Sequence, residues 1–320
     1  IEPKYKLAGK EELDWYAERQ KELDKVIKAP PSNLERKTLS TLWQIRKSHS
    51  KVYGAKAANL GEITSARIPR VTVPRGFAIP FFYYDAFMKE NGFSEKIEDL
   101  RDDDDFVHNP KIRKQKLKAF REEIQNAEFD AKLKTAILRK WRTYLGGRGV
   151  FIRSSSNAED MPNFSGAGLY ETVPNVKKAD EVIEAVKTVW ASLWNFEAYE
   201  ARERNFIAHK GTYMGVLMQT GVDMDSSGVL ITKDPFDQQN DRAMYISAKR
   251  GLGIKVVDGK KIAEQILFNR RSNAVQVLTR SAEDTLLTFD ADGGVKEVPI
   301  QGNRNVLTPI VTRRLVAAGE

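Results

Sequence analysis

The sequence predicts an α+β protein, and three features of its pattern lead to this class. Before residue 208 the apolar residues recur mostly with the spacing of amphipathic helices. From Met214 onward they come in short runs separated by turn residues, which is typical of strands. A charge-free run at 149–152 is followed at once by one arginine and three serines, which indicates a buried strand that ends abruptly. Helices that come first and strands that follow favour α+β or mixed α/β architecture.

Helices are predicted for most of the first part of the chain. The first spans residues 11–29 and ends at Pro30-Pro31, because proline stops a helix. We interpret residues 1–41 as a helical extension or linker ahead of a main domain at 42–320. Further helices are predicted at 54–65, 81–91, 111–127, 129–145, 178–207 and 307–320.

The remaining segments are predicted to be extended or turns. Residues 73–80 are extended between prolines, and the acidic run 102–105 is a charged turn. A four-carboxylate metal site at that run is disfavoured, since consecutive acids cannot all point at one ion. Helical spacing places five aromatic residues in the core: Trp190, Trp194, Phe196, Tyr199 and Phe206. Strands are predicted in the runs MGVLMQTGV, SGVLITKDP, AMYISAKRG, AEQILFNR, AVQVLT and TLLTF.

The composition is that of an ordinary globular protein with a modest basic excess. No cysteine is present, so disulfides, thiolate zinc sites and cysteine nucleophiles are excluded. The 52 basic and 44 acidic residues give a net charge of +8, but both signs are interleaved along the predicted helices, so we expect no nucleic-acid binding. No membrane span and no signal peptide are expected. The missing initiator methionine indicates a processed chain or a fragment, and a cytoplasmic location is expected.

Arg153 is the first candidate for chemistry. Its guanidinium is a permanent cation with a rigid fork suited to phosphate oxygens, and the strand before it would hold it in place. A structural ion pair with Glu159 or Asp160 is an equally good explanation of the arginine alone. The loop SGAGLYET at 165–172 favours an anion site, because glycines let backbone N–H groups approach an anion and the serine and threonine add hydroxyl donors.

Lys56 is the second candidate cation. It stands in the run GAKAANL at a predicted helix start, where the positive field of the helix N-terminus adds to its own charge. An isolated lysine in such a place is usually a solvated surface residue, so both interpretations stay open at this point. Neither cation, nor the glycine loop, identifies a function separately.

Seven segments, in order, resemble a known family. They are GAKAANLGEI, IPRVTVPRGFAIP, VFIRSSSNAEDMPNFSGAGLYETV, VWASLWNFEAYEARER, VLMQTGV, SGVLITKDP and AKRGLG. They resemble successive motifs of the nucleotide-binding domain of phosphoenolpyruvate synthase and pyruvate phosphate dikinase. The same domain serves rifampicin phosphotransferases and the plant glucan water dikinases. The resemblance covers residues 42–320.

The resemblance implies an ATP-grasp-like architecture, in which two α+β lobes close over ATP. By motif match, Lys56 and Arg153 are the phosphate-binding cations and the candidate catalytic residues. Gly168 and Thr172 belong to the loop over the phosphates, and Gln219 falls where the family has a nucleotide-contacting glutamine. Family members transfer a phosphoryl group from ATP to a histidine on a separate swivelling domain, which carries it to an acceptor. Fixed cations and a covering loop suit this chemistry, which needs mainly positioning and charge neutralisation.

ATP and Mg²⁺ are the cofactors that the resemblance implies. The family's magnesium ligands stand in a segment of the form PxDIEW, which is expected beyond Glu320, so the domain is interpreted as truncated at its C-terminal end. The three histidines stand in contexts unlike the family's histidine motif. A phosphohistidine swivelling domain and an acceptor domain are therefore the expected partners, and this chain alone is expected to bind nucleotide poorly and not to catalyse.

One departure from the family pattern keeps alternatives open. Ile254 follows GLG where the family typically has a glutamate, which removes a carboxylate from that motif. A degenerate ATP-grasp lobe acting as a non-catalytic interaction module is one alternative, and a glucan water dikinase-like enzyme is another. The amino-acid sequence of the WASLWNFEAYEARER segment favours a phosphoenolpyruvate synthase-like phosphotransferase.

Overall fold

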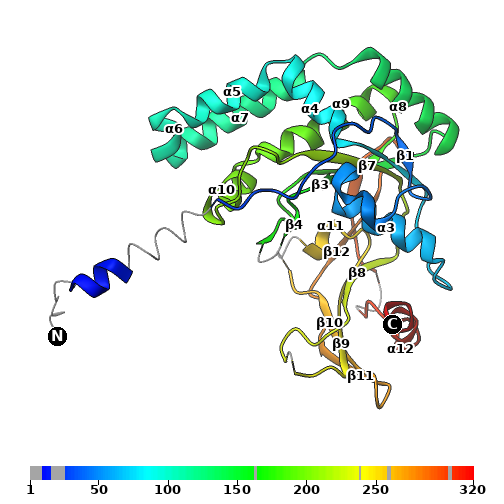
Figure 1. Ribbon diagram of the computed structural model, residues 1–320. Coiled ribbons are helices and arrows are strands. Elements are labelled where there is room, and N and C mark those ends of the chain that lie inside the picture. The colour runs from blue at the N-terminus through cyan, green and yellow to red at the C-terminus, as the bar shows by residue number, and fades with distance from the viewer. Residues whose placement is uncertain (1–8, 16–25, 162–163, 238, 258–260, 302–304) are drawn as a thin grey trace.

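The computed structural model describes residues 9–15, 26–161, 164–237, 239–257, 261–301 and 305–320. It combines helices with antiparallel sheets, so the predicted α+β class is confirmed. Figure 1 shows the long helices gathered at the top of the molecule, with a second sheet and α12 extending away below them. A short helical segment at residues 10–15 lies apart from the rest of the chain.

The first sheet has five strands, and each is antiparallel to its neighbours. Its central strand β7 (Met214–Thr220) is buried except at its last residue. The order across the sheet is β1 (Ser40–Thr41), β2 (Gly76–Ile79), β7, β3 (Val150–Ser156) and β6 (Thr172–Val176). The strand that begins at the charge-free run therefore lies beside the buried central strand of the sheet.

Helices pack on both faces of this sheet, as the alternation along β7 requires. Val216 and Met218 belong to the main hydrophobic cluster with α9, whereas Leu217 between them packs with Ala57 and Ala58 of α3. The helices in this part of the chain, not all of which touch the sheet, are α2 (Ser50–Tyr53), α3 (Ala55–Ala66), α4 (Phe81–Glu90), α5 (Phe93–Arg101), α6 (Asp104–His108), α7 (Pro110–Asn126), α8 (Ala131–Tyr144), α9 (Ala179–Ala191) and α10 (Phe196–Arg204). Two 3₁₀ turns, η1 (Lys47–His49) and η2 (Ser192–Trp194), stand among them.

Capping residues fix the starts of the long helices. The Asn109 side chain accepts from the backbone N–H groups of the first turn of α7, and Pro110 occupies the first helical position, where its missing N–H costs nothing. The Asp130 carboxylate accepts from the Leu133 N–H at the start of α8. These local signals explain why the predicted boundaries of both helices were close to the observed ones.

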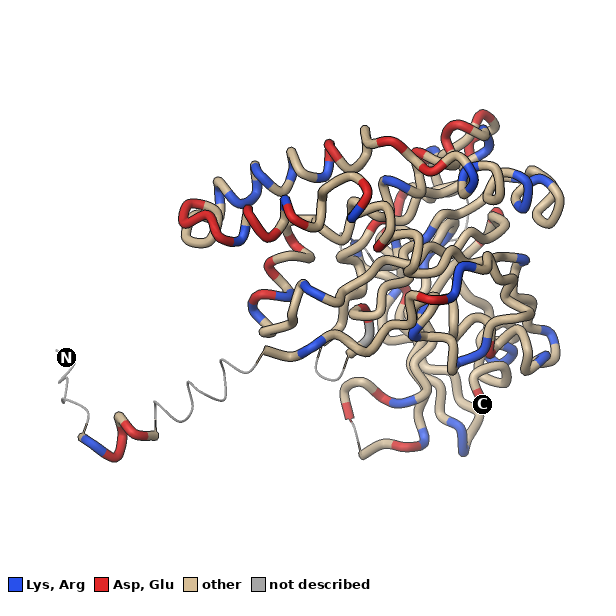
Figure 2. Tube along the Cα trace, turned by 45° about the horizontal axis from the view of Figure 1, so that its top comes forward, with Lys and Arg blue, Asp and Glu red and all other residues tan. Residues whose placement is uncertain are grey.

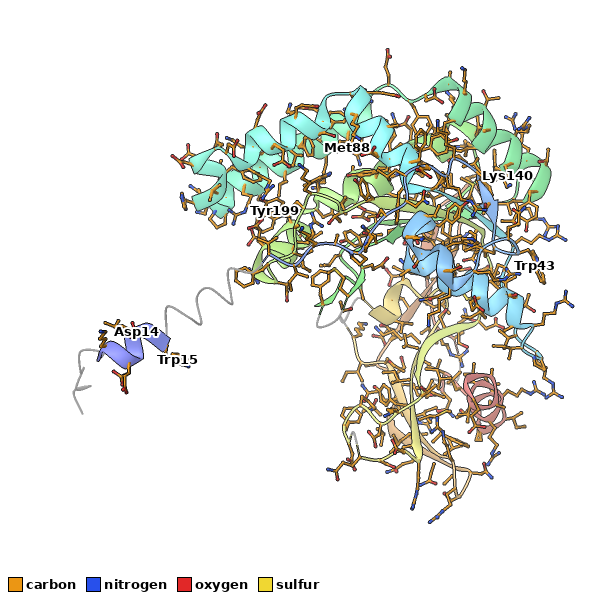
Figure 3. All side chains as sticks on the ribbon, viewed as in Figure 1. Asp14, Trp15, Trp43, Met88, Lys140 and Tyr199 are labelled. Carbon is orange, nitrogen blue, oxygen red and sulfur yellow. The ribbon has the colours of Figure 1, made fainter. Side chains whose placement is uncertain are left out.

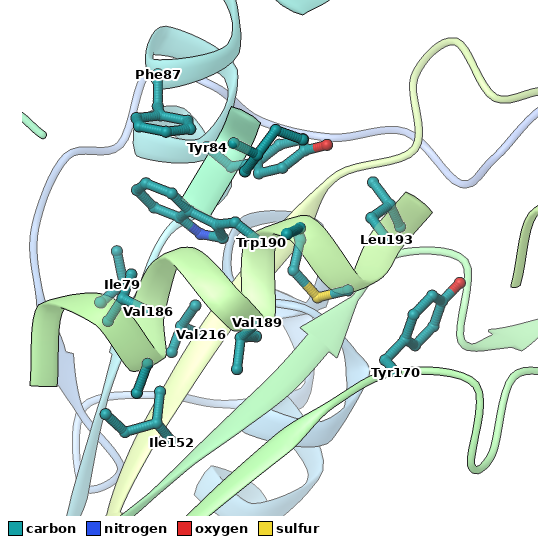
Figure 4. Close-up of a cluster of buried hydrophobic side chains, with 14 of the residues drawn as sticks. Ile79, Tyr84, Phe87, Ile152, Tyr170, Val186, Val189, Trp190, Leu193 and Val216 are labelled. Atoms are coloured by element: carbon teal, nitrogen blue, oxygen red, sulfur yellow. The ribbon is translucent and has the colours of Figure 1, made fainter. Parts of the chain in front are cut away.

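The main core is built around Trp190 of α9, which is fully buried. Its ring stacks on Phe129 with the centroids 5.4 Å apart, and it contacts Phe87 at 5.0 Å and Tyr84 at 6.1 Å. Figure 4 shows this tryptophan between the side chains of α4 and the aliphatic residues of the sheet. The predicted core position is confirmed for Trp190, Trp194 and Tyr199, which are buried, and Phe196 is partly buried against the same cluster.

The second sheet has four antiparallel strands, and α12 (Pro309–Gly319) packs against it. Val316 of α12 belongs to a hydrophobic cluster with Ile246 and Phe268. The strand order is β11 (Ala274–Thr279), β10 (Glu264–Asn269), β9 (Ala243–Arg250) and β8 (Ser226–Ile231).

A hairpin of β12 (Thr285–Phe289) and β13 (Val295–Pro299) connects the two sheets. Leu287 bridges Gly251 at the end of β9, while the Phe289 ring lies 5.7 Å from that of Phe151 in β3. The hairpin therefore fixes how the lower sheet sits against the upper one.

Some predictions of local structure were wrong. The predicted turn at 102–105 is confined to its start, because the Asp103 carboxylate accepts from the Phe106 N–H and starts α6, which contains Asp104 and Asp105. Ile27 is extended and bridges Ile207, so the 11–29 helix does not continue to its predicted end, and residues 16–25 lie outside the described part. Phe206 is 41% exposed rather than buried. Strand β13 was missed because its run VKEVP carries two charges.

Charges of both signs occur along the helices at the upper left of Figure 2. Trp15 and Trp43, labelled in Figure 3, are exposed, and the Arg67 guanidinium lies over the Trp43 ring at 5.7 Å from its centroid. Among the described residues, no helix combines the length and the apolar character that crossing a membrane requires.

Candidate functional site

Neighbouring strands bring three of the predicted site residues together. In the sheet register, Arg153 of β3 pairs with Thr172, the first residue of β6, on one side and with Leu217 of β7 on the other. Gln219 lies two residues further along β7, on the same face as Leu217. The Arg153 guanidinium donates a hydrogen bond from Nη1 to the Gln219 Oε1 at 3.1 Å.

Arg153 lies inside its strand and not at the strand end, which corrects the prediction. β3 continues to Ser156, because the backbone of all three serines pairs with β7. Their hydroxyls also have partners, which lets them be buried: Ser155 Oγ accepts from the Ala57 N–H at 3.0 Å, and Ser154 Oγ accepts from the Lys56 ammonium at 3.2 Å.

The Gln219 amide is held at both ends. Its Nε2 donates to the Pro74 carbonyl at 3.1 Å, so its Oε1 is turned towards Arg153. Burial lowers the pKa of Arg153 from its usual value, and the Glu159 carboxylate acts in the opposite direction. The guanidinium nevertheless stays charged, because arginine does not lose its proton in proteins.

Lys56 stands on the second residue of α3, and the start of this helix is fixed against β3. Gly54 precedes the helix with φ +84, and a side chain there would place its Cβ 1.9 Å from the Ser155 carbonyl oxygen. Only glycine allows this close approach. The Lys56 Nζ consequently lies beside β3, 2.9 Å from Glu159 Oε1 and within hydrogen-bond distance of Ser154.

The glycine loop lies between β5 (Phe164–Ser165) and β6 and is tied to the site at its start. The Gly166 N–H donates to the Glu159 carbonyl at 2.7 Å. Gly168 is exposed, has φ +79, and has no atom within 4 Å of the position of an added Cβ. At the far end the Asn195 Nδ2 donates to the Leu169 carbonyl at 3.1 Å. The loop therefore has two anchored ends and an open centre at Gly168.

A buried cluster behind the loop was missed by the sequence reasoning. Arg202 of α10 is fully buried and donates to His209 Nδ1 at 3.0 Å, to the Leu193 carbonyl at 2.7 Å and, at 3.5 Å, to the hydroxyl of Tyr170 in the loop. Its only sequence signal is its place in the EARER run of the fourth motif. The cluster links that motif to the glycine loop.

His209 in this cluster is a neutral imidazole. Because Nδ1 accepts from Arg202, the ring proton is on Nε2, which donates to the Glu203 carboxylate at 2.6 Å. Burial lowers the pKa of His209 to about 4, against the opposing effect of Glu203. The ring also stacks on Tyr199 with the centroids 4.2 Å apart.

The donor set at Lys56 and Arg153 fits a polyphosphate. Glu159 connects the two cations, since it pairs with Lys56 at 2.9 Å and its charge acts on Arg153, and the N-terminus of α3 adds its positive field at Lys56. Gly168 leaves room for an anion to approach the loop backbone. No group of three or more His, Asp or Glu among the described residues could hold a metal ion, including the acidic run 102–105. Such a site can bind and neutralise an anion.

The sequence matches the family described as the pyruvate phosphate dikinase AMP/ATP-binding domain over residues 50–314. It is 33% identical over 264 residues to phosphoenolpyruvate synthase of Aeropyrum pernix, covering 81% of this chain and 32% of that protein. It is 30% identical to a probable phosphoenolpyruvate synthase of Methanothermobacter thermautotrophicus, covering 88% and 41%. A rifampicin phosphotransferase of a Streptomyces species is 32% identical, covering 83% and 30%.

The chain therefore belongs to the pyruvate phosphate dikinase AMP/ATP-binding domain family, since the match covers most of its length. It spans about a third to two fifths of the length of the relatives named above. Ile254, the departure from the family pattern, begins the short helix α11 (Ile254–Val257) and is 37% exposed.

Proposed function

We propose that the chain binds ATP, with the phosphates between Lys56 and Arg153, covered by Gly168 and Thr172, and with Gln219 in contact with the nucleotide. Membership of the AMP/ATP-binding domain family supports ATP as the ligand. The observation that carries the assignment of residues is the hydrogen bond from Arg153 to Gln219 at 3.1 Å, with Thr172 opposite Arg153 in the register. Residues far apart in the sequence thus meet on neighbouring strands of one sheet.

The domain organisation belongs to the same proposal. Residues 42–320 form the ATP-binding unit in an ATP-grasp-like arrangement, with the five-stranded and four-stranded sheets in separate lobes, and residues 1–41 are an extension. The hairpin β12–β13 supports the two-lobe description, because it contacts both sheets. The anchored ends and open centre of the glycine loop support its role as a cover over the phosphates.

In the complete protein, the proposed activity is phosphotransfer of the phosphoenolpyruvate synthase type. ATP supplies the phosphoryl group, and a histidine on a separate swivelling domain passes it to the acceptor. Lys56 and Arg153 neutralise the phosphates and orient them, which is the main contribution of protein groups to phosphoryl transfer. The names of the relatives support a phosphotransferase over a non-catalytic module. Mg²⁺ is proposed as the companion ion of the nucleotide.

Calorimetric titration with ATP tests the assignment. Replacing Arg153 by alanine should weaken ATP binding by about tenfold or more, since one charge-assisted contact to phosphate is worth roughly 1.5–3 kcal/mol. Arg113 of α7 is the matched control, because it is also an inward-facing arginine and pairs with Glu200 of α10 at 2.6 Å. Arg113→Ala should leave ATP affinity unchanged. Absence of ATP binding, or equal binding by the Arg153→Ala variant, contradicts the proposal.

A further inference from the structure

Glu159 is a buried carboxylate in the middle of the proposed phosphate site. The residue is 7% exposed, and its Oε1 pairs with the Lys56 ammonium at 2.9 Å. Its other oxygen, Oε2, is shielded from solvent and accepts no hydrogen bond from any described residue. An unsatisfied buried carboxylate oxygen costs free energy, so a carboxylate kept in this state needs an explanation beyond packing.

The charge of Glu159 acts on both candidate cations. It pairs directly with Lys56, and its field raises the pKa of Arg153 against the lowering effect of burial. Its backbone carbonyl also accepts from the Gly166 N–H at 2.7 Å, so the same residue fixes the start of the glycine loop. An anion that approaches Lys56 and Arg153 therefore meets a fixed negative charge among its binding groups.

We propose that Glu159 determines specificity for the metal-complexed form of the nucleotide. This inference rests on the proposed ATP site. A bare triphosphate at Lys56 either displaces Glu159, which leaves a buried carboxylate without its partner, or binds beside it and is repelled. A nucleotide that carries a divalent cation brings the positive charge that the unpaired carboxylate oxygen lacks, and carboxylate oxygens are ligands that Mg²⁺ accepts. The site thus discriminates against free ATP.

The quantity to measure is the ratio of two dissociation constants, that of ATP with EDTA over that of ATP with excess Mg²⁺. In the wild-type chain this ratio should be well above one. Glu159→Gln removes the charge and keeps the shape, so metal-free ATP should bind about tenfold tighter than to the wild type, and the ratio should fall by about the same factor. Glu159→Asp retains the charge and should keep the ratio close to that of the wild type.

Two further variants make the result interpretable. Glu200→Gln removes another inward-facing carboxylate, which pairs with Arg113 between α10 and α7, and should leave the ratio unchanged. Glu159→Ala removes both the charge and the carboxylate oxygens, so the ratio should fall as it does in Glu159→Gln, and this variant decides the question if Glu159→Gln does not fold. The same ratio in the folded Glu159 variant as in the wild type overturns the inference while ATP binding stands. No ATP binding by the wild type overturns the proposed function and this inference together.

Discussion

Arg153 and Arg202 are both inward-facing cations, yet their surroundings differ. Arg202 is fully buried, and its guanidinium donates to a histidine, to a backbone carbonyl and, at 3.5 Å, to a tyrosine. Arg153 is partly exposed, and among the described residues a single side chain, Gln219, accepts a hydrogen bond from it. The difference separates an arginine whose donors maintain the fold from one with donors left for a ligand. Burial alone therefore does not identify a functional cation.

Replacing each arginine by alanine should give the largest difference in stability between the two sites. Arg202→Ala should lower the free energy of unfolding by more than about 3 kcal/mol, because His209, the Leu193 carbonyl and Tyr170 each lose a buried donor. Arg153→Ala should lower it by about 1 kcal/mol or less, since one amide contact is lost at a partly exposed position. Urea unfolding of the two variants measures both values.

Equal stability losses in the two variants would contradict the distinction. In that case Arg153 would be a structural residue like Arg202, and its effect on ATP binding would have to be attributed to unfolding. Arg202→Lys sharpens the test, because it retains the charge but cannot supply the planar fork that reaches three acceptors. It should remain clearly less stable than the wild type.

Acidification should act on the Arg202 cluster and not on Arg153. Burial lowers the pKa of His209 to about 4, from an ordinary value of 6.5. Between these values the unfolded chain takes up a proton that the folded chain does not, so stability is fully present above pH 6.5 and is lost as the pH falls. Going from pH 7 to pH 5 should reduce the free energy of unfolding by about 2 kcal/mol through this residue.

The His209→Gln variant isolates this effect. Urea unfolding at pH 7 and pH 5 should show a smaller pH dependence in the variant than in the wild type. His49 contributes in the same direction, because burial and two neighbouring arginines lower its pKa, so the variant should retain some dependence. Staying above pH 5 avoids most of the titration of Glu203, whose pKa is lowered by its hydrogen bond to His209. A wild-type stability that is flat over this interval would mean that His209 is protonated in the folded chain.

The order of elements in the helical half could be predicted from the sequence, because periodicity and caps are local signals. Asn109 and Asp130 stand where helices begin, and α7 and α8 follow them. The continuation of β3 through Ser154–Ser156 could not be predicted, since serines indicate a loop unless their hydroxyls find partners. Those partners, the Ala57 N–H and the Lys56 ammonium, lie 98 residues away in the chain.

The residues of the candidate site were predicted from the resemblance to a known family, and the structure adds their contacts. Glu159 was considered as a partner of Arg153, but its ion pair is with Lys56. Periodicity could not reveal this pairing, because it depends on how α3 docks against β3 through Gly54. The burial of Arg202 could not be predicted for the same reason, since nothing in EARER tells which of its charges is buried.

Gly168 gives the smallest expected effect and tests the loop side of the site. Gly168 has φ +79, and an added Cβ would meet no atom within 4 Å, so Gly168→Ala introduces backbone strain without a clash. A residue other than glycine costs about 1–2 kcal/mol in this left-handed region. We expect that loss in the free energy of unfolding, together with about threefold weaker ATP binding, because an alanine resists the backbone conformation that the loop uses to approach phosphate.

Gly147 provides the matched comparison, because it also has a left-handed backbone, with φ +62, and no atom near an added Cβ. It lies in the turn between α8 and β3, at the opposite end of β3 from Ser156. Gly147→Ala should therefore cost the same stability as Gly168→Ala and leave ATP affinity unchanged. If the two variants lose stability equally and bind ATP equally well, the backbone at Gly168 plays no part in holding the nucleotide. The phosphates would then be held by Lys56 of α3 and Arg153 of β3 without the loop.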